Sequence, residues 1–277
     1  KNGFDYYSIN IELGQETIHY YFEIRSGKIT CFYNELGVTR DLQEQYSFGI
    51  VPGFRTPGWA KGAVMYQIFV DRFCNGDPSN DVLTGEYFYI NEQTTRVTDW
   101  GKMPENMDVN NFYGGDLKGV MDKLDYLQEL GVGAIWLSPF NDSPNYDNGY
   151  DVSDYYKVME EAGTMEELEE LIAACEKREI VVMMDLVLNH SSHLHPWFLE
   201  ARKDRNSKYH DFYIWKEGTK EQPPEGGGAF FGGSTWEWVP EVQEYYYHSF
   251  SVMQPDLNWK NPSLRKELYR MIQFWMD

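Results

Sequence analysis

Three apolar, β-branched runs of strand length, at residues 63–70, 132–138 and 180–188, constrain the fold of this chain most. Runs that are apolar at nearly every position are typical of strands covered on both faces, as in a parallel sheet. Between them lie two stretches with helical periodicity, residues 117–130 and a second stretch that opens with a capping box at Thr164. Strands that alternate with helices predict right-handed βαβ units, which fit either an open doubly wound sheet or the start of a (β/α)8 barrel.

The third apolar run ends in polar groups that a core strand does not need. Asp185, Asn189 and His190 stand at its C-terminal end. Since ligands bind outside the carboxyl ends of parallel strands, these residues indicate a binding site. A lone histidine after an apolar strand is also compatible with a hydrogen-bonded core position, and an aspartate there could be catalytic or structural.

Composition excludes some functions. The formal charge of −20 argues against nucleic acid as a partner, because nucleic-acid affinity rests on basic contacts to phosphate. No apolar run is long enough to span a membrane, and no Gly-x-Gly-x-x-Gly follows the first predicted strand, which argues against a Rossmann dehydrogenase. Aromatic residues make up 17% of the chain and suit either sugar rings or an ordinary core. The scattered Cys31, Cys74 and Cys175 form no disulfide or metal pattern and favour a reducing compartment.

The chain ends and one long insertion differ from the strand–helix pattern. Residues 1–53 predict a separate β-rich region, with a hairpin of residues 6–13 and 17–24, and the Pro- and Gly-rich residues 52–62 predict a linker. Residues 191–253 are too long for a structureless loop and predict an inserted subdomain. The periodicity predicts a last helix over residues 262–276.

A short loop after the first predicted strand concentrates oxygen-bearing side chains. Asn75, Asp77, Asn80 and Asp81 fall within seven residues, and glycine and proline between them allow the loop to curl. Calcium prefers six to eight oxygen ligands in a flexible geometry, and such loops supply them. A solvated turn held by Asx hydrogen bonds is the alternative.

Several ordered motifs resemble the α-amylase superfamily, glycoside hydrolase family 13. Three of its landmarks are matched by residues 149–155, 185–190 and 254–258. The segments at 66–73, 75–81 and 113–116 are similar to neopullulanases and cyclomaltodextrinases, whereas those at 143–150, 231–236 and 254–258 are similar to oligo-α-1,6-glucosidases and related α-glucosidases.

This resemblance implies an α/β fold with the first three units of a (β/α)8 TIM barrel. Residues 54–190 and 254–277 then belong to the barrel, residues 191–253 form a domain B over the substrate cleft, and residues 1–53 resemble the tail of a β-sandwich carbohydrate-binding module of family 34. The family places its nucleophile and its acid/base after the fourth and fifth strands. We therefore expect no catalytic carboxylate in this chain, and expect the chain to be a fragment that stops before them, at Asp277.

The same resemblance assigns roles to single residues. Tyr150 stacks under the sugar ring, His190 donates hydrogen bonds to sugar hydroxyls, and Asp147 binds the nonreducing terminal glucose. Asp185 and Asn189 orient their neighbours. In the neopullulanase-like pattern, Gly114 and Asp116 complete a structural calcium site with Asn75, Asp77, Asn80 and Asp81. Phe230, Phe231, Trp236 and Trp238 would supply ring surfaces of domain B toward the substrate cleft, with packing inside the subdomain as the alternative.

The expected function is a retaining hydrolase of α-1,4 or α-1,6 glucosidic bonds, with maltodextrins or isomaltooligosaccharides as substrates. The alternative is a noncatalytic carbohydrate-binding or scaffold protein with an amylase-like frame. A homodimer is left open. We expect a cytoplasmic protein, and since Lys1 to Gly3 resembles no native start, secretion also stays open.

Overall fold

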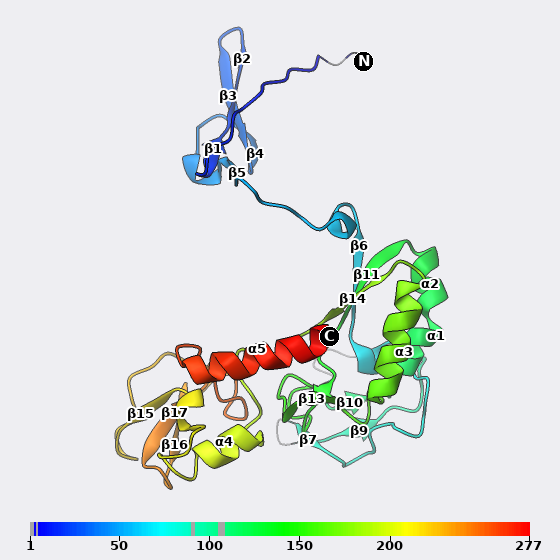
Figure 1. The fold of residues 1–277 in the computed structure, drawn as a ribbon, viewed down its shortest axis with the longest axis vertical. Coiled ribbons are helices and arrows are strands. Elements are labelled where there is room, and N and C mark those ends of the chain that lie inside the picture. The colour runs from blue at the N-terminus through cyan, green and yellow to red at the C-terminus, as the bar shows by residue number, and fades with distance from the viewer. Residues whose placement is uncertain (1–2, 4, 90–91, 105–108) are drawn as a thin grey trace. The chain divides into compact units, whose positions relative to one another are not determined.

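The computed structural model describes residues 3, 5–89, 92–104 and 109–277, which divide into two compact units. The first unit is 1–61 and the second is 62–277, so the division falls at the end of the predicted linker. Each unit is described separately (Figure 1).

The first unit consists of short antiparallel strands. These are β1 (Ile18–Tyr20), β2 (Phe22–Ser26), β3 (Ile29–Asn34), β4 (Gly37–Thr39) and β5 (Phe48–Ile50). Strands β2, β3 and β4 form one sheet, and β1 pairs with β5. The β-rich character is therefore confirmed.

The predicted hairpin in this unit is wrong. Residues 6–13 lie outside the strands, and Tyr7 is 94% exposed. The hairpin is instead β2–β3, in which Ser26 pairs with Ile29 across a two-residue turn. Gly27 has φ +60° in this turn, a conformation that glycine adopts without strain. Alternation of apolar and polar residues predicts strands but does not identify their partners, which explains the error.

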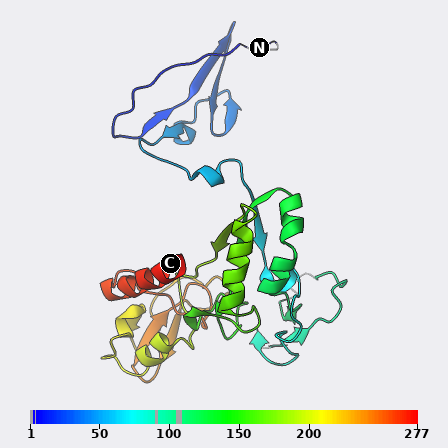
Figure 2. The same ribbon diagram turned by 45° about the vertical axis from the view of Figure 1, so that its right-hand side comes forward.

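The second unit is built on a three-stranded parallel sheet, with the order β14-β11-β6. Its strands are β6 (Val64–Ile68), β11 (Val132–Leu137) and β14 (Val181–Met184). In the register, Leu137 lies opposite both Ile68 and Met184. Helices α1 (Leu117–Asp122), α2 (Leu124–Glu129) and α3 (Met165–Glu176) cover one face of this sheet (Figures 1 and 2). This is the start of a (β/α)8 barrel, as predicted.

Two details differ from the sequence prediction. The helix expected over 117–130 is divided into α1 and α2 at Lys123, whose φ and ψ of −103° and 6° are not helical. The strand expected over 180–188 is shorter, because the chain leaves the sheet after Met184, and its residues are only half-buried. The capping box at Thr164 is confirmed, with both reciprocal hydrogen bonds to Glu167 present.

Short elements surround this sheet. Helical turns are η1 (Glu44–Tyr46), η2 (Gly58–Ala60), η3 (Val70–Arg72) and η4 (His210–Phe212). Two-residue strands are β7 (Phe88–Tyr89), β8 (Glu92–Gln93), β9 (Thr95–Arg96), β10 (Asn111–Phe112) and β12 (Asn141–Asp142), and β12 pairs with β13 (Asp154–Val158).

The inserted segment forms a small subdomain. It contains α4 (Pro196–Ala201) and an antiparallel sheet of β15 (Trp215–Glu217), β17 (Glu244–Tyr247) and β16 (Trp236–Val239). Phe198 and Tyr246 pack in one core with Val187 and with Leu264 and Leu268 of α5 (Pro262–Met276). The last helix, the subdomain and the segment that follows β14 therefore share one hydrophobic core.

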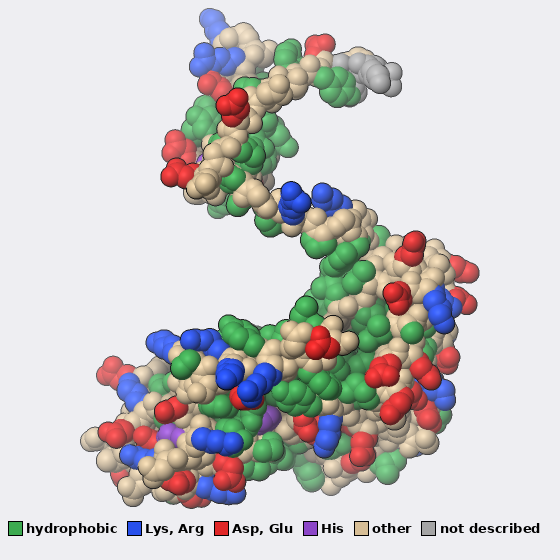
Figure 3. Space-filling view, viewed as in Figure 1, with side chains coloured by type: hydrophobic (Ala, Val, Ile, Leu, Met, Phe, Trp, Pro, Cys, Tyr) green, Lys and Arg blue, Asp and Glu red, His purple; other side chains and the backbone are tan. Residues whose placement is uncertain are grey.

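Apolar side chains reach the surface of the second unit beside β6 and at the end of α5 (Figure 3). Val64 and Met65 are about half exposed, and Met276 is 77% exposed. Within the described residues, β6 and β14 are the edge strands of this sheet, whereas a closed barrel has no edge strands. Within the described part of the chain, no helix is long and apolar enough to cross a bilayer.

Candidate active site

The predicted sugar-binding residues come together at the C-terminal end of the parallel sheet. Asp185, Asn189 and His190 follow β14, and Asp147 and Tyr150 lie in the loop 143–151 between β12 and β13. The prediction from strand ends therefore locates one cluster formed by two separate segments.

Tyr150 links the two segments. Its phenol O–H donates a hydrogen bond of 3.1 Å to Oδ2 of Asp185. Burial, with the neighbouring Asp185 carboxylate as a second cause, raises the pKa of Tyr150 to about 12, so the phenol stays protonated at neutral pH. Asp185 thereby orients Tyr150, in agreement with the supporting role expected for it.

His190 holds the backbone of Tyr150. Its Nε2 lies 2.8 Å from the Tyr150 carbonyl oxygen, and its Nδ1 lies 3.2 Å from Nδ2, the side-chain amide nitrogen of Asn189. A carbonyl accepts and an amide nitrogen donates, so the ring is neutral with the proton on Nε2. Burial lowers the pKa of His190, which favours the same neutral form. A role as donor to a sugar hydroxyl requires Nε2 to exchange its carbonyl partner for the sugar.

Asp147 has a partner that the sequence analysis did not include among the site residues. The amide nitrogen Nε2 of Gln254 donates to Oδ2 of Asp147 at 2.7 Å and to the Tyr150 carbonyl at 3.2 Å. Gln254 is only 1% exposed, and its buried Oε1 has no hydrogen-bond partner in the part of the chain that the structure describes. Its position at the start of a family landmark, residues 254–258, was the signal that could have identified it.

Aromatic rings of the inserted subdomain extend from this cluster. The ring of Phe250 lies 5.4 Å from that of His190, and Phe230 and Phe231 lie 5.6 and 6.4 Å from Phe250. Phe230 is 75% exposed and Phe231 57% exposed, so their faces are open to a ligand. In contrast, Trp236 and Trp238 pack against tyrosines of the neighbouring strand β17, and their contacts are those of subdomain packing.

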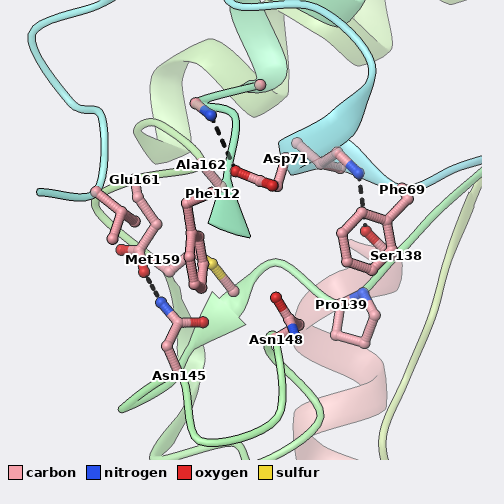
Figure 4. A pocket seen from close by; sticks show the side chains of 14 residues that line it. Phe69, Asp71, Phe112, Ser138, Pro139, Asn145, Asn148, Met159, Glu161 and Ala162 are labelled. Carbon is pink, nitrogen blue, oxygen red and sulfur yellow. Dashed lines mark hydrogen bonds between the residues drawn. The ribbon is translucent and has the colours of Figure 1, made fainter. Parts of the chain in front are cut away.

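A small cavity lies beneath the loop 143–151 (Figure 4). Burial raises the pKa of two carboxyl groups that line it, Asp71 to about 6 and Glu161 to about 7. Glu161 accepts a hydrogen bond from Nδ2 of Asn145, and Asp71 accepts from the backbone N–H of Tyr113 and Gly114. The volume of this cavity, about 40 Å³, admits water but is too small for a sugar ring.

The predicted calcium residues lie in a second cluster, away from the sugar-binding set along the chain. Among the described residues, the buried side-chain oxygens Oδ1 of Asn75 and Asn80 have no hydrogen-bond partner, which suits a cation that takes oxygen ligands. Gly114 has φ +76°, and a Cβ there would lie 2.3 Å from Oδ1 of Asp81 and 2.7 Å from Asn75. Gly114 therefore closes the loop against these two side chains, and the two amide oxygens are acceptors of the kind that calcium takes.

Asp116 is poorly suited to the predicted role of calcium ligand. Its carboxylate caps α1 by accepting from the N–H of Gly119 at 2.6 Å, and it also accepts from the N–H groups of Gly76 and Asp77. These donors occupy most of its lone pairs. Asp81 is also engaged, since one of its oxygens pairs with Arg96. The structure thus gives Asp116 a helix-capping role that the predicted ligand set did not include.

The family model described as the α-amylase catalytic domain matches residues 67–277, about three quarters of the chain. The chain belongs to the α-amylase family. The resemblance found in the motifs is thereby confirmed, and the matched region contains β11, β14, the end of β6, the inserted subdomain and the cluster of Asp147, Tyr150 and His190.

Several relatives of this chain are named as glucosidases. An oligo-1,6-glucosidase of Bacillus cereus is 51% identical over 171 residues, which are 62% of this chain and 31% of the relative. Among solved structures, the trehalose-6-phosphate hydrolase of Bacillus licheniformis is 41% identical, and the isomaltulose synthase SmuA of Protaminobacter rubrum is 38% identical. Each covers 80% of this chain with a TM-score of 0.64, and 34% of its own chain is matched. The chain thus spans about a third of the length of these relatives.

Proposed function

We propose that the protein containing this chain is a retaining, exo-acting α-glucosidase that releases glucose from the nonreducing ends of α-1,6-linked oligosaccharides. The observation that carries this proposal is the hydrogen-bonded set of Asp147, Tyr150, His190 and Gln254 at the strand ends. The names of the relatives, oligo-1,6-glucosidases among them, favour the α-1,6 bond over the α-1,4 bond.

The chemistry of these groups suits a terminal glucose. An ionised Asp147 accepts charge-assisted hydrogen bonds from hydroxyls of a terminal glucose, whose 4- and 6-hydroxyls are both free, whereas a mid-chain residue has one of these two substituted. The ring of Tyr150 offers an apolar face to the sugar ring. Phe230 and Phe231 then offer exposed ring faces for the part of the substrate beyond the cleaved bond.

Retention requires a second set of groups. Retaining glycosidases use two carboxyl groups about 5 to 5.5 Å apart, one as nucleophile and one as acid/base. We assign both to the part of the barrel that follows the third strand, in the protein to which this chain belongs. This chain contributes the glycone side of the pocket. The three free cysteines favour a cytoplasmic location for it.

The test is glucose release from isomaltose and from maltotriose, measured with the protein that contains this chain. We expect isomaltose to be the better substrate, and Asp147→Asn to lower kcat/KM for it by about 100-fold, as the loss of a charged hydrogen-bond partner does. Asp142→Asn is the matched control, because its carboxylate accepts from Ser153 and belongs to the same loop region. Binding of isomaltose without glucose release would instead favour a noncatalytic carbohydrate-binding protein.

We also propose that the loop of Asn75, Asp77, Asn80 and Asp81 binds a structural calcium ion with the Gly114 carbonyl. Two buried amide oxygens without partners support this proposal. When bound, the ion would cross-link the loop after β6 to the segment before α1. Asp116 would contribute by holding the backbone of the loop through Gly76 and Asp77.

A further inference from the structure

The loop 143–151 carries Asp147 in a backbone conformation that its own residues disfavour. Asn145 and Asn148 have φ values of 56° and 47°, and Gly149 has φ 90°. Left-handed conformations at non-glycine residues persist only where the surroundings fix them. The position of the Asp147 carboxylate therefore depends on groups that hold this loop from outside or across it.

One buried carboxyl group makes most of these contacts. Asp151, which is 0% exposed, accepts hydrogen bonds from the hydroxyl of Ser143 at 2.9 Å, from the backbone N–H of Tyr146 at 3.1 Å and from the backbone N–H of Asp147 at 3.0 Å. All three donors belong to the same loop. The carboxyl group thus forms the centre around which the loop turns.

A second carboxyl group, that of Glu161, holds the loop at a position farther from Asp147. Asn145 donates to Glu161 on the side of the small cavity, as Figure 4 shows. That contact fixes a side chain two residues before Asp147, whereas Asp151 binds the N–H of Asp147 itself. Of the carboxyl groups of Asp151 and Glu161, that of Asp151 therefore fixes the backbone position of Asp147 more directly.

We propose that Asp151 is a positioning residue of the sugar pocket, whose carboxylate fixes the Asp147 backbone so that the Asp147 side chain meets Gln254 and the terminal glucose. This inference rests on the proposed function, because it assigns Asp147 to sugar binding. It adds a residue that touches no substrate and acts only through Asp147.

The chemistry of the three donors favours a carboxylate at this position. A carboxylate accepts at both oxygens, and here Oδ1 serves Ser143 and Asp147 while Oδ2 serves Tyr146. An amide of the same shape accepts at one oxygen only, and its NH2 group would face an N–H donor. Asp151→Asn therefore breaks at least one contact while it leaves the volume of the side chain unchanged.

The test is a double-mutant cycle in the protein that contains this chain, with kcat and KM for isomaltose as readouts. We expect Asp151→Asn to raise KM by about tenfold, the effect of one charge-assisted hydrogen bond, with a smaller change in kcat. In an Asp147→Asn background the same substitution should change KM by less than about twofold, since a residue that acts through Asp147 has nothing left to position. Equal effects in both backgrounds would overturn the proposal.

Hydrogen exchange at the amides of Tyr146 and Asp147 gives a readout that does not depend on activity. Both amides should exchange faster in Asp151→Asn and remain unchanged in the control Asp142→Asn. If the wild-type protein cleaves no glucoside, the proposed function fails, and the exchange rates alone decide whether Asp151 orders the loop. If Asp151→Asn does not fold, Ser143→Ala replaces it, because it removes one of the three donors and should produce a smaller change of the same sign. Unchanged exchange in the folded variant would also overturn the proposal.

Discussion

At the scale of single residues, three carboxyl groups of the second unit lie buried within the protein. Burial raises the pKa of Asp71, Asp151 and Glu161 above their ordinary values, although each accepts hydrogen bonds. Desolvation therefore outweighs the hydrogen bonds at all three positions. Such groups lower stability at neutral pH, which is typical of residues retained for a functional geometry.

The raised pKa of Asp151 leads us to predict that the free energy of unfolding depends on pH through this group. Its pKa is about 7 in the folded chain and its ordinary value is 3.8, so the folded state holds the proton more tightly than the unfolded state. The contribution of this group to the free energy of unfolding is then largest below about pH 4 and falls as pH rises to about 7. Urea unfolding of wild type and Asp151→Asn between pH 4.5 and 7.5 should show the variant gaining relative stability with rising pH. A difference that is independent of pH would contradict this, and Asp142→Asn again serves as control.

The sequence placed the residues of the proposed sugar site near one another but did not predict their contacts. Asp147, Tyr150, Asp185, Asn189 and His190 were all expected there, since motif and strand end indicate the same place. Their hydrogen bonds to one another depend on distances that no spacing along the chain encodes. Gln254 was missed as a site residue because it is more than one hundred positions from its partner Asp147.

At the scale of elements, local signals were the most reliable. The capping box at Thr164 predicts the start of α3, and the helix over Pro262–Met276 was expected with the bounds that the structure shows. Both signals lie within a few residues of the element that they define. The hairpin of the first unit failed because strand pairing is nonlocal: β1 pairs with β5, about thirty residues away.

For the Asx-rich loop after β6, we predict that calcium stabilises the folded state. Calcium at 100 times its Kd stabilises the folded state by about 2.7 kcal/mol, which raises Tm by about 5 to 10 °C for a unit of this size. A chelator should reverse this shift in calcium-loaded protein, and Asn80→Ala should abolish it. Differential scanning calorimetry with and without chelator measures the shift.

Asn110 offers a matched control for that experiment. Its buried Oδ1 also has no hydrogen-bond partner among the described residues, but Asn110 lies outside the predicted ligand set. Asn110→Ala should therefore keep the full response to chelator. Identical melting curves for loaded and chelated wild type would remove calcium from this loop and leave a turn held by Asx hydrogen bonds.

At the scale of the whole molecule, alternating strands and helices left two architectures open, and family motifs decided between them. Hydrophobic periodicity describes each βαβ unit but not the closure of a barrel, because closure depends on strands that follow the third. The division into two units follows from composition, since the glycines and prolines of residues 52–62 limit regular structure there.

Limited proteolysis tests this division. Arg55 and Lys61 are exposed and lie in the segment that leads to β6, whereas the strands and helices of the second unit are held by a buried core. Trypsin should therefore cut after one of these residues first and release a fragment that begins at Thr56 or Gly62. Mass spectrometry of early time points identifies the cut. Earlier cleavage after Lys220, in the inserted subdomain, would contradict the expected order.

The left-handed residues of the loop 143–151 also affect how this protein can be re-engineered. A backbone that needs Asn145, Asn148 and Gly149 in rare conformations tolerates few replacements, so random libraries directed at this loop would consist mostly of inactive variants. The exposed turn of Phe230 and Phe231 carries no such constraint at its two aromatic positions. Under the proposed function, selection for new substrates should therefore find its productive mutations in that turn, while the loop 143–151 stays invariant.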